Sequence, residues 1–375
     1  MKFRLAFLLE QTLGHVAHTK NIERALSSHP WVEPTVIKLP FDARPRPTAW
    51  VPGGRNWSVR ASLMARRGLA QRLRQGALDA VFVHTQVAAL LSAGLFARVP
   101  TVISLDATPR DFDEVGFAYG HRRQARWLEE LKAALNRRAL AGATALVTWS
   151  RQAARSLSEH YGVDPDRITV IRPGVDLGLF RPGGPWPRGD RFRVLFVGGD
   201  FRRKGGYDLL QAMRLLPATA ELDVVTGTTV TGVPPGVTVR VHTGLGPGDP
   251  GLLELYRRAD VFALPTLGDC FPQVLAEAAA SGLPIIATNS GAIGEIVRPG
   301  ANGLLVPAAD AGELAAALRL LMDNARVRHS MGQESLRIAR EEHDAFRNNT
   351  RIFELMADCA RARGSRLSAV SRAAG

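Results

Sequence analysis

The chain repeats one pattern along its length: a short apolar run rich in β-branched residues, followed by a stretch long enough for a helix. Strands joined in this way are typical of parallel sheets, because parallel neighbours cannot be connected by a tight turn. The runs lie at 3–9, 35–39, 80–84, 101–105, 145–149 and 168–172, and then at 193–198, 221–227, 237–242, 261–265, 283–288 and 303–307. The pattern predicts an α/β protein with two doubly wound parallel sheets.

A segment rich in Pro and Gly, at 172–190, separates the two sets of runs. Such a composition continues neither a helix nor a central strand and indicates a linker. We expect a Rossmann-like domain over 1–178, a second over 179–345, a helix over 346–362 and a flexible basic tail over 363–375. Two such sheets in tandem are expected to bind a ligand in a cleft between the domains, at the carboxyl ends of their strands.

The cysteines and the apolar segments indicate the cellular compartment of the protein. Cys270 and Cys359 are the only cysteines, too few for a disulfide framework and without the spacing of a metal site. The apolar run at 5–9 ends at Glu10, and no segment approaches the roughly 18 apolar residues of a membrane span. We therefore expect a cytoplasmic protein.

The formal net charge is +13, and residues 1–180 hold 25 Lys and Arg against 15 Asp and Glu. The arginines are scattered, and no basic run alternates with aromatic residues, so nucleic acid is not an expected partner. The helical pattern at 59–75 sets five arginines against leucines and methionine. Such a face can lie on an anionic membrane surface, although many solvated helices share the pattern, so a peripheral place on the inner membrane face stays open.

Two acids lie eight residues apart in the stretch 267–288. Asp269 falls in the turn after a strand, and Glu277 falls in the helix that Pro272 would begin, since proline suits the first helical position. A carboxylate at Glu277 can accept two hydrogen bonds from a vicinal diol such as a ribose, and Asp269 can hold a second polyol. The alternative is that Asp269 caps the helix and Glu277 is a surface residue.

The start of this helix adds a second kind of contact. The backbone N–H groups of Gln273 and Val274 have no partner within the helix, and we expect them to point into the cleft. A helix start of this kind favours hydroxyl oxygens or anions. The stretch therefore predicts a site for a ligand with two sugars.

A basic cluster follows the first strand of the second set. Lys204 is the only lysine after Lys132, and it stands next to Arg203, before two glycines that precede a helix. Arginine can grip a diphosphate in a fork, and lysine can act as a mobile point charge. The cluster predicts a diphosphate site, with an ordinary solvated charge run as the alternative.

Two further residues follow strands of the first set. Gly14 would let the backbone approach a ligand closely, next to the helix that begins near His15, but no G-x-G-x-x-G fingerprint accompanies it, which argues against a dinucleotide. Asp106 follows the run at 101–105 and should face the cleft. The D-F-D triplet at 111–113 is too common a pattern to indicate a metal site, and none is expected.

Taken together, the segments resemble family 4 of the retaining, nucleotide-sugar-dependent glycosyltransferases. YGVDPDRITVIRPGVDLGLF resembles the family's inter-domain stretch, DFRRKGG its diphosphate-binding segment, and GDCFPQVLAEAAASGLPIIAT its E-x7-E signature. The likeness covers nearly the whole chain and is strongest at about 192–325. It implies the GT-B fold, in which two Rossmann-like domains face across a cleft and the last helix, 346–362 here, packs back on the N-terminal domain.

The resemblance implies a role for each candidate residue. Glu277 would bind the donor ribose and Asp269 the transferred sugar. Arg203 and Lys204 would contact the diphosphate, and Gly14 would close over the phosphates. The remaining expected contacts are Phe271, Gln273, Val274 and Gly199 to the donor, and Asp106 among the catalytic residues.

Two departures from the family pattern stand out. The first acid of the signature is usually Glu, and Asp269 is one methylene shorter, which would affect the choice of donor sugar. Many relatives have a His where this chain has Asp106, so the usual contact to the donor sugar would be made differently.

The implied reaction transfers a hexose from a nucleotide diphosphate sugar to an acceptor hydroxyl on a glycolipid, polysaccharide or small molecule. The anomeric configuration would be kept, and no metal or other cofactor would be needed. The alternatives are a nucleotide-sugar 2-epimerase and a non-catalytic nucleotide-sugar binding protein. A phosphorylase with pyridoxal phosphate would need a Schiff-base lysine in the second domain, where only Lys204 could serve, in a loop that a diphosphate site explains better.

Overall fold

The computed structural model describes residues 2–12, 14–41, 56–119, 126–184 and 190–373. The chain divides into two compact units. The N-terminal unit consists of 1–108, 123–172 and 346–375, and the C-terminal unit consists of 109–122 and 173–345. The segment 109–122 thus groups with the second unit, although the sequence suggested a single N-terminal domain over 1–178.

The N-terminal unit contains a six-stranded parallel sheet in the order β2-β1-β3-β4-β5-β6. Its strands are β1 (Phe3–Gln11), β2 (Val32–Pro40), β3 (Ala80–Val83), β4 (Thr101–Leu105), β5 (Ala145–Thr148) and β6 (Ile168–Val170). Its helices are α1 (His15–Leu26), α2 (Trp57–Gln75), α3 (Gln86–Ala89), α4 (Ala93–Phe96), α6 (Arg126–Gly142), α7 (Arg151–Tyr161) and the 3₁₀ turn η3 (Pro165–Arg167).

Both faces of this sheet are covered, as the strand pattern predicts. Successive side chains of a strand point to opposite faces, so Ala6 and Leu8 join one apolar core while Leu5 and Phe7 join the other. The first core includes Leu69 of α2. Central strands buried on both faces explain the continuous apolar runs in the sequence.

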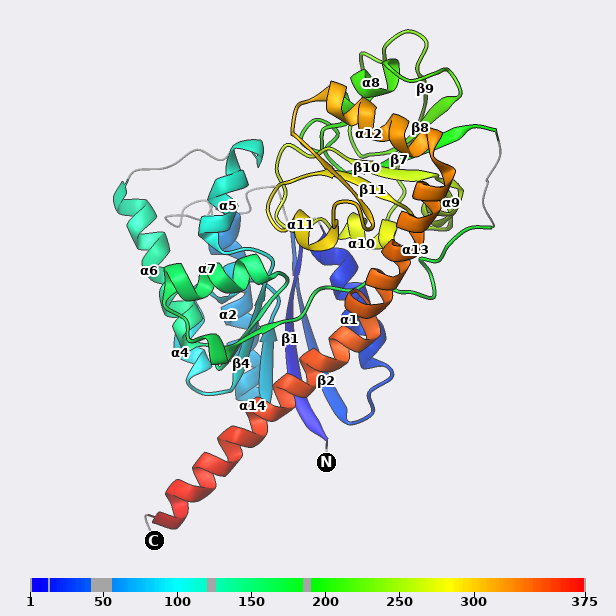
Figure 1. The fold of residues 1–375 in the computed structure, drawn as a ribbon. Coiled ribbons are helices and arrows are strands. Elements are labelled where there is room, and N and C mark those ends of the chain that lie inside the picture. The colour runs from blue at the N-terminus through cyan, green and yellow to red at the C-terminus, as the bar shows by residue number, and fades with distance from the viewer. Residues whose placement is uncertain (1, 13, 42–55, 120–125, 185–189, 374–375) are drawn as a thin grey trace. The chain divides into compact units, whose positions relative to one another are not determined.

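The last helix, α14 (Ala345–Ala373), is drawn in orange to red in Figure 1, and its Ile352, Phe353 and Met356 belong to the second core. Phe353 packs its ring against Phe7 with a centroid distance of 5.5 Å. We predicted a helix that ends at residue 362 and a flexible tail over 363–375, but the helix continues to Ala373. Ser365 donates its hydroxyl hydrogen to the carbonyl of Arg361, so this polar residue is accommodated within the helix.

The C-terminal unit contains the second parallel sheet, in the order β12-β11-β10-β7-β8-β9. Its strands are β7 (Phe192–Val197), β8 (Ala220–Val225), β9 (Thr238–His242), β10 (Val261–Leu264), β11 (Ile285–Thr288) and β12 (Gly303–Val306). Its helical elements are α5 (Pro109–Val115), η2 (Gly116–Tyr119), α8 (Gly206–Arg214), α9 (Pro250–Arg258), α10 (Gln273–Ala280), α11 (Ile293–Ile296), α12 (Ala311–Asp323) and α13 (Ala325–Glu342). The prediction of two doubly wound parallel sheets is confirmed.

The predicted linker is tied to the end of α13. The N–H of Val175 donates to the carbonyl of His343 (2.8 Å), and the N–H of Ala345 donates to the carbonyl of Val175 (3.1 Å). A side chain at Gly174 would place its Cβ 2.2 Å from the nitrogen of Ala345, so only glycine fits. Residues 185–189 of this segment lie outside the described residues. Within the described part of the chain, no helix is long and apolar enough to cross a membrane.

Candidate functional site

The second sheet reverses its strand order between β7 and β10. These strands are direct neighbours, with Val194 opposite Val261, and the following strands lie on opposite sides of the pair. Loops that leave the carboxyl ends at such a point diverge, and open α/β sheets bind their ligands there. The two loops are 198–205 and 265–272, which contain the basic cluster and the first acid of the sequence analysis.

The loop after β7 is shaped by its own polar groups. The Asp200 carboxylate accepts a hydrogen bond from the N–H of Arg203 (3.0 Å), and the N–H of Phe201 donates to the Thr228 hydroxyl (3.2 Å). Gly205 has a φ of +77°, and a Cβ there would lie 1.8 Å from the carbonyl oxygen of Pro265. The loop therefore lies directly against the turn that follows β10, and glycine is required for this approach.

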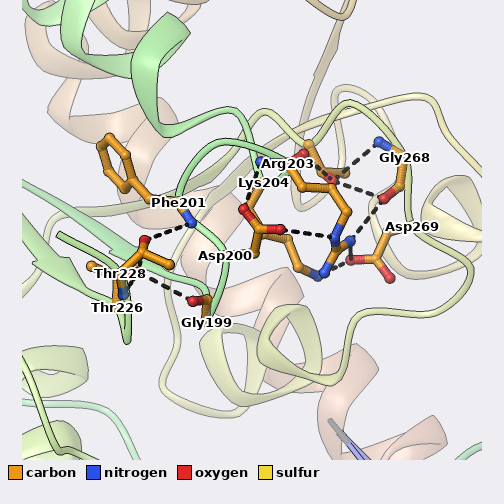
Figure 2. A network of polar contacts seen from close by, with 10 residues as sticks. Gly199, Asp200, Phe201, Arg203, Lys204, Thr226, Thr228, Gly268 and Asp269 are labelled. Atoms are coloured by element: carbon orange, nitrogen blue, oxygen red, sulfur yellow. Dashed lines mark hydrogen bonds and ion pairs between the residues drawn. The ribbon is translucent and has the colours of Figure 1, made fainter. Parts of the chain in front are cut away.

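Three charged side chains meet between the two loops (Figure 2). The Lys204 ammonium forms an ion pair with the Asp269 carboxylate. The Arg203 guanidinium donates to the carbonyl of Gly268 (3.0 Å), and its Nη1 lies 3.9 Å from Asp269 Oδ2. The side chains of Arg203, Lys204 and Asp269 are only 10%, 13% and 9% exposed. The alternative of a solvated charge run is therefore wrong.

Residues 109–119 reach this same turn. A Cβ at Gly268 would lie 2.7 Å from the Cβ of Ala118 and 3.1 Å from the carbonyl oxygen of Val115. The absence of a side chain at Gly268 thus lets α5 and η2 pack beside the residue that precedes Asp269. This contact explains why the segment belongs to the C-terminal unit.

Glu277 lies in α10, one turn beyond the helix start. Pro272 is the N-cap, with φ −73° and ψ 110°, so the helix begins one residue later than predicted. Glu277 is 5% exposed, which rules out the alternative of a surface residue. The Tyr256 hydroxyl donates to Glu277 Oε2 (2.9 Å). Burial raises the pKa of Glu277 to about 7, against the opposing effect of this hydrogen bond, and raises the pKa of Tyr256 well above its usual range.

The other expected donor contacts belong to the same two loops and to α10. Phe271 and Gln273 are buried, and Val274 is half-buried. Gly199 is exposed, and a Cβ there would meet nothing within 4 Å, so neither space nor backbone strain requires glycine. Its carbonyl accepts a long hydrogen bond from the Thr226 hydroxyl (3.5 Å).

Gly14 and Asp106 belong to the N-terminal unit and the other candidates to the C-terminal unit. Gly14 is the N-cap of α1 and has an ordinary helical φ of −64°, so its backbone alone does not require glycine. Asp106 directly follows β4, and its Oδ1 accepts from the N–H of Ala107 (2.9 Å). Contacts from either residue to a ligand stay predictions.

Sequence reasoning missed a polar cluster in the N-terminal unit, where the first sheet reverses its order between β1 and β3. Glu10 is 4% exposed and accepts three hydrogen bonds. The donors are the Thr85 hydroxyl (2.5 Å), the Trp57 indole (2.8 Å) and the Thr12 hydroxyl (2.9 Å). An acid at the end of an apolar strand was the available signal, but we read it only as the end of the apolar run.

A second missed cluster consists of aromatic rings beside these strands. The ring centroids of His15 and His18 each lie 4.8 Å from that of His84, and Trp149 lies 5.5 Å from His18. The ring nitrogens of His18 have no hydrogen-bond partner among the described residues. Burial, aided by the neighbouring imidazoles, lowers the pKa of His18 to about 3 and that of His84 well below its usual value. Within the described ranges, no group of three or more His, Cys, Asp or Glu residues is arranged to hold a metal ion.

Both halves of the chain match known protein families. Residues 191–324 match the family described as glycosyl transferases group 1, and residues 14–179 match the family described as glycosyltransferase family 4. Each match covers most of one of the two sheets and its helices. Together they include every candidate residue that the sequence analysis named.

Curated relatives carry a more specific name. The D-inositol 3-phosphate glycosyltransferase of Thermomonospora curvata is 36% identical over 231 residues, which cover 53% of this chain and 54% of the relative. The protein of the same name from Paenarthrobacter aurescens is 30% identical over 288 residues, which cover 70% of this chain and 69% of the relative. The chain thus spans about half the length of the first of these relatives.

Solved structures show the same fold at lower identity. Sucrose-phosphate synthase from Thermosynechococcus elongatus superposes with a TM-score of 0.79 at 17% identity, over 96% of this chain and 100% of that chain. HepE from Anabaena, in complex with UDP and glucose, superposes with a TM-score of 0.70 at 16% identity, over 95% of this chain and 100% of that chain. The likeness shows the predicted GT-B fold class.

Proposed function

The chain belongs to the glycosyltransferases of group 1 and family 4, and we propose that it moves a hexose from a nucleotide diphosphate sugar to an acceptor hydroxyl with retention of the anomeric configuration. One observation carries this proposal. Arg203 and Lys204 are withdrawn from solvent at the carboxyl edge of the second sheet, where they meet Asp269. Desolvated cations at such an edge favour an anionic ligand, and the diphosphate of a nucleotide sugar has a matching charge.

The neighbouring acids take the roles that the family resemblance implies. Glu277 accepts hydrogen bonds from the donor ribose, and Asp269 accepts from the transferred sugar. Because Lys204 pairs with Asp269, a bound diphosphate would share the ammonium with this carboxylate. Phe271, Gln273 and the other expected donor contacts complete the pocket wall. The Anabaena neighbour that holds UDP and glucose supports a nucleotide sugar as the donor class.

The transfer step needs no metal in this proposal. The bond between the anomeric carbon and the diphosphate breaks, a bond to the acceptor oxygen forms on the same face, and the acceptor proton passes to an oxygen of the leaving diphosphate. Arg203, Lys204 and the N-terminus of α8 stabilise the charge that develops on that diphosphate. Addition of a chelator should therefore leave the rate unchanged.

The acceptor is assigned to the N-terminal unit. In this proposal Gly14 of that unit closes over the donor phosphates, and Asp106 lies near the reacting sugar. The names of the curated relatives make D-inositol 3-phosphate the first acceptor to test. The exposed arginines of α2, which include Arg66, Arg67 and Arg74, support a peripheral place on an anionic membrane surface. A cytoplasmic location is part of the same proposal.

The test is a donor and acceptor panel with product detection by mass spectrometry. A thermal-shift screen with UDP, GDP and ADP sugars comes first, because a ligand bound only by the folded state raises its apparent stability. The purified protein is then incubated with the stabilising donor and with D-inositol 3-phosphate or a lipid extract, with and without chelator. A glycosylated acceptor supports the proposal. Donor turnover without acceptor would indicate an epimerase, and tight binding without turnover would indicate a binding protein.

A further inference from the structure

Tyr256 is a buried aromatic residue of α9 with one polar contact. Its side chain is 1% exposed. The ring lies parallel to that of Phe262, at a centroid distance of 5.8 Å and an angle of 20°, and edge-on to that of Phe180, at 5.5 Å and 81°. The hydroxyl donates to Oε2 of Glu277 at 2.9 Å. A phenylalanine would fill the same apolar space, so this contact is what the hydroxyl adds.

The hydrogen bond from Tyr256 can hold the Glu277 carboxylate in one orientation. A buried hydroxyl is costly unless it is hydrogen-bonded, and an acceptor with negative charge forms the stronger bond. Tyr256 uses Oε2 of Glu277 only, and Oε1 has no hydrogen-bond partner among the described residues. The carboxylate is therefore held at one oxygen and available at the other.

We propose that Tyr256 is a positioning residue for the donor: its hydroxyl orients the Glu277 carboxylate through Oε2, so that Oε1 is presented to the vicinal hydroxyls of the donor ribose. This inference rests on the proposed function. It adds a residue outside the sequence signature to the donor site. It also explains why α9, which contributes no residue to the basic cluster, carries a buried polar atom facing α10.

The electrostatics of Glu277 give this contact a measurable consequence. Burial favours the protonated carboxyl and raises its pKa to about 7, whereas the Tyr256 hydroxyl favours the ionised form. Tyr256 is the only titratable residue in the described part of the chain with a resolved effect on this pKa. Loss of the hydroxyl therefore raises the pKa of Glu277 further. As the pH falls, the carboxylate is then protonated, and ribose binding lost, at a higher pH than in the wild type.

The substitution Tyr256→Phe removes the hydroxyl and keeps the ring. We expect donor affinity at pH 7 to fall about 10-fold, the scale for a hydrogen bond to a charged group, with KM raised and kcat little changed because the bond holds in both ground and transition states. We also expect the pH midpoint of donor binding to move upward relative to the wild type. Tyr207→Phe is the matched control, because that hydroxyl is exposed and contacts Thr231 at 3.5 Å.

A double-mutant cycle with Glu277→Gln separates positioning from general packing. If Tyr256 acts through the carboxylate, removal of its hydroxyl should change donor affinity much less in the Glu277→Gln background than in the wild type. Donor binding is measured by calorimetry from pH 6 to 8.5, and thermal unfolding checks that each variant is folded. If Tyr256→Phe fails to fold, Tyr256→Leu in the same cycle provides the test, because leucine also lacks a hydrogen-bond donor.

The outcomes are distinct. Wild-type affinity and an unchanged pH midpoint in Tyr256→Phe, together with weak binding by Glu277→Gln, would overturn the positioning role and leave the proposed function intact. Equal losses in both backgrounds would assign Tyr256 a packing role and also overturn the inference. Failure of the wild type to bind any nucleotide sugar would overturn the proposed function itself.

Discussion

The two parallel sheets place polar residues at the same topological point, where the strand order reverses, but with different chemistry. In the C-terminal unit this edge carries two largely buried cations, 10% and 13% exposed, and the Asp269 carboxylate. In the N-terminal unit it carries the Glu10 carboxylate, which accepts only from uncharged donors among the described residues, beside the His18 imidazole that burial keeps neutral. The topology fixes where a site can form, and the side chains decide which charge it accepts.

The two units also differ in how burial shifts the pKa of their titratable residues. His18 and Glu277 are both deeply buried, and burial disfavours the charged form of each. For a histidine this lowers the pKa, and for a carboxylic acid it raises the pKa, so the two units should respond to pH in opposite directions. Two predictions test this contrast, and two more test the contrast between buried and exposed charge.

The largest expected effect is the acid sensitivity that His18 gives the N-terminal unit. Its pKa is about 3 in the folded state against 6.5 as the unperturbed value, so the unfolded state binds the proton more readily below pH 6.5. The contribution of His18 to the free energy of unfolding is therefore at its full value above pH 6.5. It should fall by about 4–5 kcal/mol as the pH drops to about 3. His18→Leu should remove this contribution and leave the one from His84, whose pKa burial also lowers, so the fall should be smaller than in the wild type in denaturant unfolding from pH 4 to 8.

A matched control uses the exposed His329, where His329→Gln should leave the pH dependence unchanged. Equal pH slopes for His18→Leu and the wild type would contradict the account. They would mean that His18 is hydrated or hydrogen-bonded in solution.

Glu277 should produce the opposite slope in the C-terminal unit. Its pKa is about 7 in the folded state against 4.5 as the unperturbed value. The contribution of Glu277 to the free energy of unfolding is at its full value below pH 4.5. It should decrease by about 3 kcal/mol as the pH rises through 7. Glu277→Gln should therefore be more stable than the wild type at pH 8, although it binds donor more weakly.

Denaturant unfolding of both proteins at pH 5 and pH 8 measures this difference. Glu254→Gln serves as the control, because that side chain is 55% exposed. A Glu277→Gln variant that is destabilised equally at both pH values would show that packing, and not ionisation, dominates at this position.

Lys204 tests whether the buried cations of the C-terminal unit serve an anionic ligand. Lys204→Met keeps the length of the side chain and removes its charge. We expect kcat/KM for the nucleotide sugar to fall roughly 10- to 150-fold, or about 1.5–3 kcal/mol, the scale for a hydrogen bond to a charged group.

Arg202→Ala is the control in the same loop, since Arg202 is exposed and stacks over the ring of Tyr207 at 5.3 Å. It should retain nearly full activity. Equal losses in both variants would indicate a general effect of positive charge on the loop, and wild-type rates in Lys204→Met would remove the proposed diphosphate contact.

The sequence was sufficient to predict the strands and the loops that carry the candidate site of the C-terminal unit. Central strands of parallel sheets are buried on both faces, so their apolar runs stand out, and all twelve predicted strands occur in the structure. The basic cluster and the acids were located in the same way, as residues that follow such runs.

The sequence did not reveal which polar groups contact each other. Lys204 and Asp269 are 65 residues apart, and they meet because β7 and β10 are neighbours, a pairing that local patterns do not encode. Tyr256 and Glu277 meet through the packing of two helices on one sheet. The imidazole cluster was missed for the same reason, since His84 is far in sequence from His15 and His18.

The smallest expected effect concerns an exposed ion pair of the N-terminal unit. Lys38 lies 2.8 Å from Glu23, and the two side chains are 50% and 36% exposed, in contrast to the buried pair of Lys204 and Asp269. Water screens such a pair, and holding two long side chains in one geometry opposes it entropically, so Lys38→Gln should change the free energy of unfolding by about 0.2–1 kcal/mol. A double-mutant cycle with Glu23→Gln, measured at low salt and at about 1 M salt, isolates the pair. A coupling above that range, or one that persists at high salt, would show that the contrast between exposed and buried charge in the two units is wrong.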